Sequence, residues 1–393
     1  MGNRKKVFVV ANVVKEHILK FHIPTIKEMT KRGWTVDVGA SGDETVPYCH
    51  QQYSLPHQRS PFHLGTLKSI WKLRKILKSG GYDIVYCHTP VGGLVGRLAS
   101  LGLRKQGTRV IYFVHGYHFY KGATFFNWLV YYPIEKLLSL FTDSIILINQ
   151  EDYHLTKTKF KQVQSYLVSG MGVKQERFSP QSNQVSGMGV KQERFSPQSN
   201  QVRERYRKEL KLPEDATVLI YCAELIKNKN QTFLLHAMKK LVDQGENLYC
   251  LLVGIDYTKG EMVEYIQSLN LSDRVLLLGW REDIANLYAC SDICVATSIR
   301  EGFGLNIVEA MFCHVPVVAT INRGHASIIQ DGQNGLLVQL GNTKQLVEAI
   351  YVLMKDTKKK QELVEQASAN LEQYHSQKIV NSLLEIIEQT AMK

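Results

Sequence analysis

Two glutamates in the second half of the sequence stand at a spacing that suits an anion-binding turn. Glu301 and Glu309 are separated by seven residues, and a Gly-Phe-Gly turn (302–304) directly follows the first. Glycines there allow the backbone to approach a ligand closely. A helix expected to begin near Leu305 would point its free N–H groups at a pyrophosphate. Glu309, one turn into that helix, could accept hydrogen bonds from ribose hydroxyls, and Glu301 could face a sugar.

The elements that must position these residues alternate along the whole chain. Short β-branched runs separated by helical patterns are typical of βα units and parallel sheets. Strands are expected at Lys6–Val13, Thr35–Ala40, Asp83–Cys87, Arg109–His115, Ser144–Ile148, Thr217–Cys222, Leu248–Val253, Arg274–Leu278, Asp292–Thr297 and Pro316–Thr320. Helices are expected near Pro24–Arg32, Thr66–Lys78, Gly92–Leu101, Asn127–Phe141, Gln231–Asp243, Gly260–Leu269, Asp283–Cys290, Asn306–Phe312 and Thr343–Lys355. The pattern predicts an α/β protein of two Rossmann-like doubly wound domains facing a central cleft, with ligands at the carboxyl ends of the strands.

The composition agrees with two domains and divides the charge between them unequally. The chain has 393 residues, more than one core usually holds, and its 44% hydrophobic and 21% charged residues are ordinary for a globular enzyme. Residues 1–200 carry 27 Lys and Arg against 12 Asp and Glu, whereas residues 201–393 carry 21 against 24. The basic first half fits an anionic membrane, a phosphorylated lipid or nucleic acid as partner, or a solvated basic surface.

The cysteines and the apolar runs indicate a reducing compartment and no membrane span. The cysteines form no Cys-x-x-Cys pair and lie mostly in apolar runs, as buried free thiols do; they are Cys49, Cys87, Cys222, Cys250, Cys290, Cys294 and Cys313. No small-residue cleavage site follows the first apolar run (7–14), so we expect a strand there and no signal peptide. The longest apolar stretch, Phe125–Ile134, is too short to span a bilayer. A cytoplasmic protein is expected.

A duplication separates the two halves of the sequence. Residues 168–184 read VSGMGVKQERFSPQSNQ, and residues 185–201 repeat them without a change. Two copies are too few for a solenoid, so we interpret the segment as a duplicated linker. The predicted organisation is an N-terminal domain at 1–167, a linker at 168–202, a C-terminal domain at 203–373 and a last helix at 374–393 that returns to the first domain.

Several motifs resemble those of one enzyme family. The segment SIREGFGLNIVEAMFCHVPVVATINRGHASIIQDGQNGLLV (298–338) resembles the retaining glycosyltransferases of the GT-B architecture that carry the E-x7-E motif. The resemblance covers the whole chain apart from one copy of the linker. More narrowly, VVKEHILKFHIP, YCHTPVGGLVGRLAS, HGYHFYKG, AELIKNKNQ and INRGH look like bacterial exopolysaccharide and capsule transferases. The motifs imply a reaction class and leave the transferred sugar open.

The resemblance implies a donor site around the two glutamates. Glu309 would hold the donor ribose, and Glu301 would contact and orient the transferred sugar. The backbone of the turn between them would bind the distal phosphate region; its residues are Gly302, Phe303, Gly304 and Leu305. A UDP-sugar is the expected donor of a hexosyl unit.

Two further residues take part in the implied reaction. Lys229, in the KNKNQ loop after a strand, would neutralise the leaving diphosphate as a point charge. His115, at the end of a first-domain strand, would lie near the reacting sugar, although a strand-end histidine taken alone is more often structural. His118 and Lys121 in the same segment are weaker candidates on the acceptor side.

Retention is explained in this family by front-face substitution, in which the diphosphate leaves and the acceptor hydroxyl attacks the same face. The protein then mainly stabilises the charge that develops on the leaving group. Lys229 and a helix N-terminus can do this without a divalent ion, and no Asp-x-Asp occurs in the chain. Neither a metal ion nor a cofactor is therefore expected.

The sequence departs from the family pattern in two places. Ala223-Glu224 stands where a Gly-Arg is frequent, so one phosphate-binding cation is missing, and Glu224 would repel a diphosphate unless it faces elsewhere. His314 replaces a usual glycine, which costs roughly 1 kcal/mol if the position requires a positive φ. The loop Arg281–Asp283 resembles the family's loop beside the nucleotide base, and an ordinary solvated loop fits it equally well.

The acceptor in the narrower group is typically a polyprenyl-diphosphate-linked sugar at the cytoplasmic membrane. Leu67–Lys78 predicts a basic amphipathic helix; Lys68, Lys72 and Lys75 share one face, and Leu67, Ile70, Trp71, Leu73 and Leu77 lie largely on the other. Such a helix suits an anionic membrane or packs its apolar face on the sheet. Phe125, Phe126 and Trp128 could hold a lipid or begin a buried helix. We expect a peripheral protein on the inner face of the cell membrane.

Other classes of protein fit the sequence less well. A transferase acting on a soluble acceptor agrees less with the basic first half, and Glu224 and His314 would suit a catalytically silent sugar-nucleotide-binding protein. A nucleic-acid-binding protein has only the charge in its favour, since no recognition motif is present. A nicotinamide-dependent oxidoreductase would carry Gly-x-Gly-x-x-Gly after its first strand, and none follows it.

Overall fold

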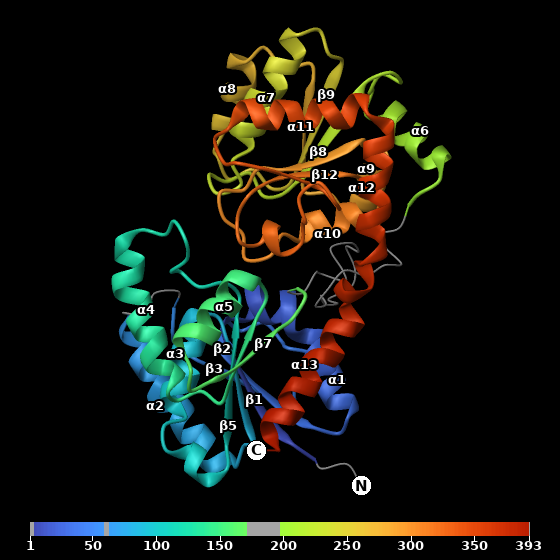
Figure 1. Cartoon of the computed structure of the whole chain (residues 1–393). Coiled ribbons are helices and arrows are strands. Elements are labelled where there is room, and N and C mark those ends of the chain that lie inside the picture. Colours follow the sequence, from blue (N-terminus) through green and yellow to red (C-terminus); the bar gives the residue numbers. More distant parts are fainter. Residues whose placement is uncertain (1–3, 59–62, 171–196, 393) are drawn as a thin grey trace. The chain divides into compact units, whose positions relative to one another are not determined.

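The computed structural model describes residues 4–58, 63–170 and 197–392, which form two compact units. Unit 1 contains the described residues up to 170 together with those from Tyr374 onward, and unit 2 contains residues 197–373. Each unit is one parallel β-sheet with helices on both faces (Figure 1). The predicted pair of doubly wound α/β domains is confirmed. Residues 171–196 of the duplicated linker lie outside the described residues.

The sheet of unit 1 has the strand order β3-β2-β1-β4-β5-β6-β7, and all neighbouring strands are parallel. The strands are β1 (Lys6–Val13), β2 (Thr35–Ser41), β3 (Gln51–Ser54), β4 (Ile84–His88), β5 (Arg109–Val114), β6 (Ser144–Leu147) and β7 (Gln164–Leu167). The central strands are buried on both faces, which explains their continuous apolar sequence. The strand order reverses direction between β1 and β4, and their carboxyl ends therefore border the switch point where ligands bind in such sheets.

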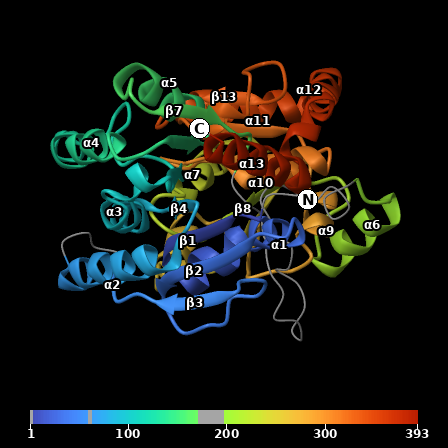
Figure 2. The same cartoon turned by 90° about the horizontal axis from the view of Figure 1, so that it is seen from below.

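Two groups of helices cover the sheet of unit 1. Helices α1 (Ile23–Lys31) and α13 (Ser376–Ala391) lie on one face, and α2 (Leu64–Gly80), α3 (Pro90–Ala99), α4 (Phe125–Ser139) and α5 (Gln150–Lys159) lie on the other (Figure 2). The main core lies under α2 and α3, where Phe8, Val10 and Val85 of the sheet meet Leu73 and Val95. The chain's last helix is bound to this unit by a hydrogen bond between Ser144 and Thr390 hydroxyls, 2.8 Å apart.

Unit 2 repeats the architecture with the strand order β10-β9-β8-β11-β12-β13, again all parallel. Its strands are β8 (Thr217–Cys222), β9 (Leu248–Val253), β10 (Val275–Gly279), β11 (Ile293–Ala296), β12 (Val317–Thr320) and β13 (Leu336–Val338). One face carries α7 (Gln231–Asp243), α8 (Glu261–Ser268) and α11 (Thr343–Lys355), and the other carries α6 (Asn200–Glu209), α9 (Ile284–Ala289), α10 (Leu305–Phe312) and α12 (Thr357–Ala369). Here the switch point lies between β8 and β11.

Several elements were not expected from the sequence. The edge strands β3, β7 and β13 are short, and α5, α6 and α12 lack a long apolar stripe. The segment between β1 and α1 is a π-helix, η1 (Val14–His22), and its i→i+5 bonds do not produce the 3.6-residue period by which helices are recognised. Short 3₁₀ turns complete the chain; they are η2 (Leu103–Gln106), η3 (His325–Ser327) and η4 (Leu371–Tyr374).

The expected apolar face of α2 divides in the structure. Leu73 and Leu77 are buried in the core, but Leu67 and Trp71 are 60% and 67% exposed, on the surface that also carries the lysines. The reason is that α2 packs mainly against α3, which covers only part of its surface. Among the helices that the structure describes, none has the length and apolar character required to cross a bilayer.

Candidate functional site

The carboxyl ends of three neighbouring strands of unit 2 bring the predicted donor residues into one region. Lys229 follows β8, Glu301 follows β11, and the loop after β12 holds Asn322 to His325. These loops meet at the switch point of the sheet because parallel strands all end at the same edge. The geometry therefore gathers charged side chains where a doubly wound sheet binds its ligand.

Lys229 and Glu301 form an ion pair in which Nζ lies 2.5 Å from Oε1. The two side chains are only 23% and 16% exposed, so the pair lies largely out of water. Burial alone would raise the pKa of the Glu301 carboxyl, but the charge of Lys229 and the neighbouring His325 outweigh burial and hold the pKa below its usual value. Glu301 is therefore an anion at neutral pH.

The loop that carries Lys229 is fixed by hydrogen bonds to the segment before Glu301. Asn228 donates its side-chain amide to the Arg300 carbonyl at 2.9 Å and accepts from the backbone N–H of Ile299 at 2.8 Å. The hydroxyl of Thr297 donates to the carbonyl of Asn230 at 2.8 Å, and that of Tyr221 donates to the carbonyl of Lys229 at 3.0 Å. These contacts hold the ammonium group in position before any ligand binds.

His325 completes this group of side chains and is wholly buried. Its Nδ1 lies 2.7 Å from the Thr320 carbonyl, which can only accept, and 3.0 Å from the side-chain amide nitrogen of Asn322, and the shorter contact favours a proton on Nδ1. Burial lowers the pKa of His325 and Glu301 opposes that effect, so the ring is neutral at neutral pH. Its other nitrogen, Nε2, has no hydrogen-bond partner among the described residues. The Nε2 atom of His325 is therefore a buried acceptor that receives no hydrogen bond from the described residues.

Two glycines let the loops of the site approach one another. A Cβ added to Gly324 would lie 2.6 Å from the Phe303 carbonyl oxygen and 2.7 Å from Glu301 Cβ. Gly304, with φ of 111°, precedes α10 in the left-handed region, and a Cβ there would lie 3.0 Å from the His325 ring. Larger residues at either position would push the Glu301 turn away from His325.

Helix α10 begins at Leu305, as the sequence predicted, and its first turn directs its N–H groups toward the Glu301 turn. Phe303 is buried beside Gly302 and Gly304, so the turn presents backbone and not side chains. Glu309 is buried one turn into the helix. Burial raises the pKa of Tyr288 and of Cys294, and the charge of Glu309 adds to both effects.

The site residues predicted in the first domain belong to unit 1, whereas the donor residues described above belong to unit 2. His115 directly follows β5, the strand next to β4, and lies close to the rings of His17, His22 and His88. The ring of His118 stacks on Tyr131 of α4, with centroids 4.6 Å apart.

The remaining predicted acceptor or membrane residues of unit 1 are surface lysines. Lys121 is exposed, and its backbone N–H donates to Glu151. Lys68, Lys72 and Lys75 are exposed on α2.

The residues that depart from the family pattern also have definite places. Glu224 is exposed, so its charge is solvated. His314 has φ of 57°, which confirms that the position requires the left-handed region. In the loop expected beside a nucleotide base, Arg281 binds Asp283 and Tyr206 donates to the same carboxylate at 2.8 Å.

Sequence reasoning missed three features of the sites. The first two are His325 and Arg323. The Nε of Arg323 donates to the Glu301 carbonyl at 3.4 Å. Their signal was the INRGH segment, which directly follows an expected strand and could have been assigned to the same sheet edge. The third is the group of histidines around His115, which periodicity cannot reveal because its members come from distant segments.

Two family models match the chain, one in each half. The model described as "Glycosyl transferases group 1" matches residues 202–370, and "Glycosyl transferase 4-like" matches residues 6–149. The chain is also 38% identical over 340 residues to "Putative glycosyltransferase EpsD" of Bacillus subtilis (strain 168), covering 86% of this chain and 84% of that protein. The chain belongs to the glycosyltransferases.

A second relative and a solved structure agree with this family and its architecture. The glycosyltransferase is 28% identical over 291 residues to the Escherichia coli "UDP-Gal:alpha-D-GlcNAc-diphosphoundecaprenol alpha-1,3-galactosyltransferase", covering 72% of this chain and 69% of the relative. The structure of Anabaena Alr3699/HepE in complex with UDP and glucose superposes with a TM-score of 0.76 at 21% identity, covering 98% of this chain and all of the other. The fold of this glycosyltransferase is therefore GT-B, as the sequence predicted.

The switch point of unit 2 provides this glycosyltransferase with groups that suit a negatively charged ligand bearing hydroxyls. Lys229, Arg323 and the start of α10 supply positive charge and N–H donors. Glu301 and the Nε2 atom of His325 supply acceptors. The combination fits the two parts of a sugar nucleotide, a diphosphate and a sugar.

Proposed function

We propose that the protein transfers a hexosyl unit from a UDP-sugar to a lipid-linked saccharide, with retention and without a metal ion, in exopolysaccharide or capsule biosynthesis. The observation that carries the proposal is the largely buried Lys229–Glu301 pair next to the start of α10. The name of the E. coli relative gives UDP-Gal as its donor and a diphosphoundecaprenol-linked sugar as its acceptor. The structural neighbour was solved with UDP and glucose. Both support a UDP-sugar as donor, and the relative supports a lipid-linked acceptor.

The leaving diphosphate gains negative charge as its bond to the sugar breaks. Lys229 opposes that charge with an ammonium group that is already held in place, so little reorganisation is needed in the transition state. The N-terminus of α10 adds N–H donors, and Arg323 brings a guanidinium to the same turn. These groups supply the stabilisation that a divalent ion gives in other transferases, which supports a reaction independent of metal.

The sugar would lie against the acceptors of the site. Glu301 is charged and can accept hydrogen bonds from two hydroxyls while it keeps Lys229. The buried Nε2 of His325 would gain a donor from a third hydroxyl, which removes the cost of an unsatisfied polar atom. Glu309 would hold the ribose, and His115 keeps the role near the transferred sugar that the family resemblance implies.

Retention follows when the acceptor attacks the face that the diphosphate leaves. The bond between the anomeric carbon and the phosphate oxygen breaks with its electron pair on the oxygen. The acceptor hydroxyl then bonds to the same face of the oxocarbenium-like sugar, and its proton passes to the departing diphosphate. No side chain has to act as a base in this sequence, and the protein's contribution is electrostatic.

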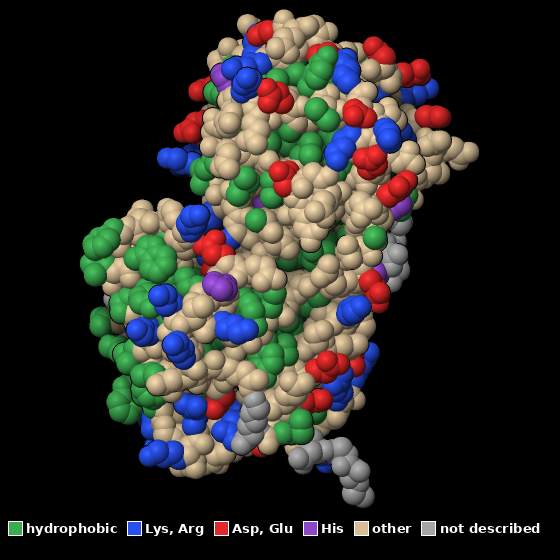
Figure 3. Space-filling view, in the orientation of Figure 1, with side chains coloured by type: hydrophobic (Ala, Val, Ile, Leu, Met, Phe, Trp, Pro, Cys, Tyr) green, Lys and Arg blue, Asp and Glu red, His purple; other side chains and the backbone are tan. Residues whose placement is uncertain are grey.

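The surface of unit 1 supports a membrane-associated acceptor. Large apolar side chains are exposed on α2 and α4, which flank α3 on one side of the sheet. Together with the exposed lysines of α2 they form what we call the α2/α4 surface. Its residues are Leu64, Leu67, Lys68, Trp71, Lys72, Lys75, Phe125, Phe126 and Leu129. Figure 3 shows hydrophobic and basic side chains beside one another on this side of unit 1. Exposed aromatic rings among lysines are typical of proteins that rest on anionic bilayers.

The transfer itself is tested with bacterial membranes and a panel of radiolabelled UDP-sugars, with EDTA present. We expect one donor to label an organic-extractable lipid, and we expect Glu301→Gln to lose the labelling. Label that appears only in the aqueous fraction would contradict the lipid acceptor. Strict dependence on added Mg²⁺ would contradict metal independence.

The membrane contact is tested by flotation of the pure protein with vesicles containing anionic lipid. We expect binding at low salt that weakens as salt screens the lysines. Trp71→Ser combined with Phe125→Ser should reduce flotation, whereas the same change at exposed Tyr257 of unit 2 should not. Equal flotation with neutral and anionic vesicles, or none with either, would contradict the proposed surface.

A further inference from the structure

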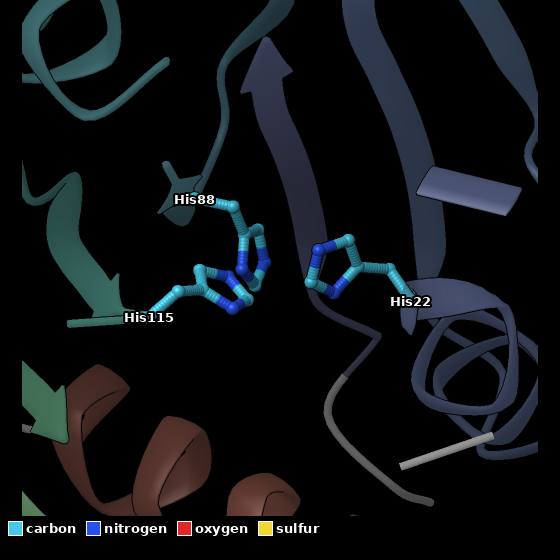
Figure 4. A group of neighbouring side chains, drawn as sticks. All are labelled: His22, His88 and His115. Carbon is cyan, nitrogen blue, oxygen red and sulfur yellow. The ribbon is translucent and has the colours of Figure 1, made fainter. Parts of the chain in front are cut away.

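Three histidines converge at the switch point of the unit 1 sheet, and the donor site described above uses at most one of them. His22 is the last residue of η1, His88 is the last residue of β4, and His115 directly follows β5. One ring nitrogen from each lies within 4.8 Å of the others. Figure 4 shows the three rings turned toward a common point from three separate segments. Residues distant in sequence are thus positioned by the fold to meet.

The two buried histidines of this group make no hydrogen bond through their rings to the part of the chain that the structure describes. His22 and His88 are 1% and 0% exposed, and neither ring nitrogen of either residue has a hydrogen bond to a described residue. Each buried polar group left unsatisfied keeps the full cost of its desolvation. Such a cost at adjacent positions is usually offset by a bound water or ion. The arrangement therefore points to a ligand at the centre of the group.

The surroundings keep the imidazoles in the form that binds metals. Burial is the main effect that lowers the pKa of His22, His88 and His115. Neighbouring histidines, His17 among them, lower it further. Neutral imidazole has one nitrogen lone pair available, whereas the charged ring has none. The ring of Tyr86 packs on His88 with centroids 4.2 Å apart, and its buried hydroxyl also lacks a hydrogen bond to a described residue.

We infer that His22, His88 and His115 form a binding site for a divalent transition-metal ion of the zinc class. Zn²⁺ binds imidazole nitrogen at about 2.0–2.1 Å in a tetrahedron, which requires nitrogens roughly 3.3 Å apart. The ring nitrogens lie within 4.8 Å of one another, so an ion of this class would draw them closer together. The fourth position is open to water or to His17, whose ring centroid lies 5.8 Å from that of His115.

The ligand chemistry decides which ions the site takes. Three imidazoles without a carboxylate suit Zn²⁺, Co²⁺, Ni²⁺ or Cu²⁺, whereas Mg²⁺ and Ca²⁺ prefer oxygen ligands. His115 is half-buried while the other two are buried, so an ion would enter from its side. No metal ligand was expected from the sequence, and this site departs from that expectation. It lies in unit 1 and takes no part in stabilising the leaving diphosphate.

The site has a consequence for activity that rests on the proposed function. A nitrogen of His115 bound to a metal ion is no longer available to a sugar hydroxyl. Zinc should therefore inhibit transfer, and removal of zinc by a chelator should restore it. Since His22 has no proposed part in catalysis, His22→Gln should keep its activity and lose its sensitivity to zinc.

Binding is measured on the full chain after metal is removed with EDTA and the chelator is dialysed away. Cobalt is titrated in, and the visible d–d absorption of tetrahedral Co²⁺ is recorded. We expect one cobalt ion per chain, displaced by Zn²⁺ and not by Mg²⁺. Changes to the outer-shell partners of a metal ligand cost about 10–100-fold in affinity, so His22→Gln, which removes a ligand, should lose at least about 100-fold. His236→Gln, at an exposed histidine of α7, should lose none.

The wild-type protein gives a decisive result even if a variant folds poorly. If its circular dichroism is that of folded protein and no cobalt band forms, the inference is overturned. It is equally overturned if folded His22→Gln binds cobalt as tightly as wild type. If cobalt binding depends on His22 but zinc leaves transfer unchanged, the metal site stands and the role proposed for His115 near the sugar fails.

Discussion

Replacing Lys229 by methionine removes the cation that faces Glu301 and keeps a side chain of similar length. In the protein Nζ and Oε1 are 2.5 Å apart, and the side chains are 23% and 16% exposed. Breaking a fully buried ion pair costs roughly 3–5 kcal/mol, because the remaining charge stays buried and uncompensated. Because water reaches this pair in part, we expect Lys229→Met to lower the free energy of unfolding by about 2–3 kcal/mol at neutral pH.

The loss of stability in Lys229→Met should depend on pH because the Glu301 carboxyl titrates. In the wild type its pKa is lowered, so its contribution to stability is present at neutral pH and is lost as the pH falls through that value. Without Lys229 the effect of burial dominates and raises the pKa, so the folded state loses stability as the pH rises through it. Both effects make the loss largest near pH 7.5 and smaller by about 1 kcal/mol or more near pH 5.

Scanning calorimetry at the two pH values measures the effect. For a unit of this size, the loss at neutral pH corresponds to a fall of roughly 5–10 °C in the midpoint of the transition that contains unit 2. Lys227→Met is the matched control, since that lysine is exposed in the same loop and should change stability by less than about 0.5 kcal/mol. Adding Glu301→Gln to Lys229→Met should recover part of the loss, because the buried charge is then removed.

Two results would refute this reasoning. Equal losses at both pH values would mean that the charge of Glu301 is not what Lys229 stabilises. A double variant whose loss equals the sum of the two single losses would mean that the side chains are not coupled.

Three further changes have expected outcomes. His314→Gly should stabilise the protein by about 0.5–1 kcal/mol, seen as a higher melting temperature, because φ of 57° favours glycine; no gain would contradict the strain. Gly324→Ala should cost about 1–3 kcal/mol and most of the donor affinity measured by calorimetry, because its Cβ would overlap the Phe303 backbone; tight donor binding would contradict that placement. Arg97→Met should cost roughly 3–5 kcal/mol in urea unfolding, because Arg97 is buried and pairs with Glu135 at 2.7 Å; recovery by Glu135→Gln checks the cause.

The sequence was most informative where strands are buried on both faces. β1, β8 and β9 have the predicted bounds, because a continuous apolar run between polar residues marks a central strand of a parallel sheet. The helices α7 and α11 also begin and end where predicted, since each has a clear apolar stripe. The edge strand β3 escaped notice because it is partly exposed and reads Gln-Gln-Tyr-Ser.

The same limits apply to the candidate sites. The spacing of Glu301 and Glu309 around a glycine turn indicated a helix start, and α10 begins there. The pairing of Lys229 with Glu301 was not predicted, because their distance depends on how β8 and β11 pair in the sheet. His22 and His88 could not be grouped with His115 from the sequence at all, since a π-helix and two strands bring them together.

The rate of sugar transfer to lipid by Lys229→Met, measured beside Lys227→Met, tests the central claim most directly. Both enzymes are assayed with saturating donor and EDTA, at a temperature below the lowered unfolding transition. If Lys229 stabilises the leaving diphosphate, kcat should fall by about 100- to 1,000-fold in Lys229→Met and remain near wild type in Lys227→Met. A kcat for Lys229→Met within about 3-fold of wild type, a barrier change below 1 kcal/mol, would contradict the account.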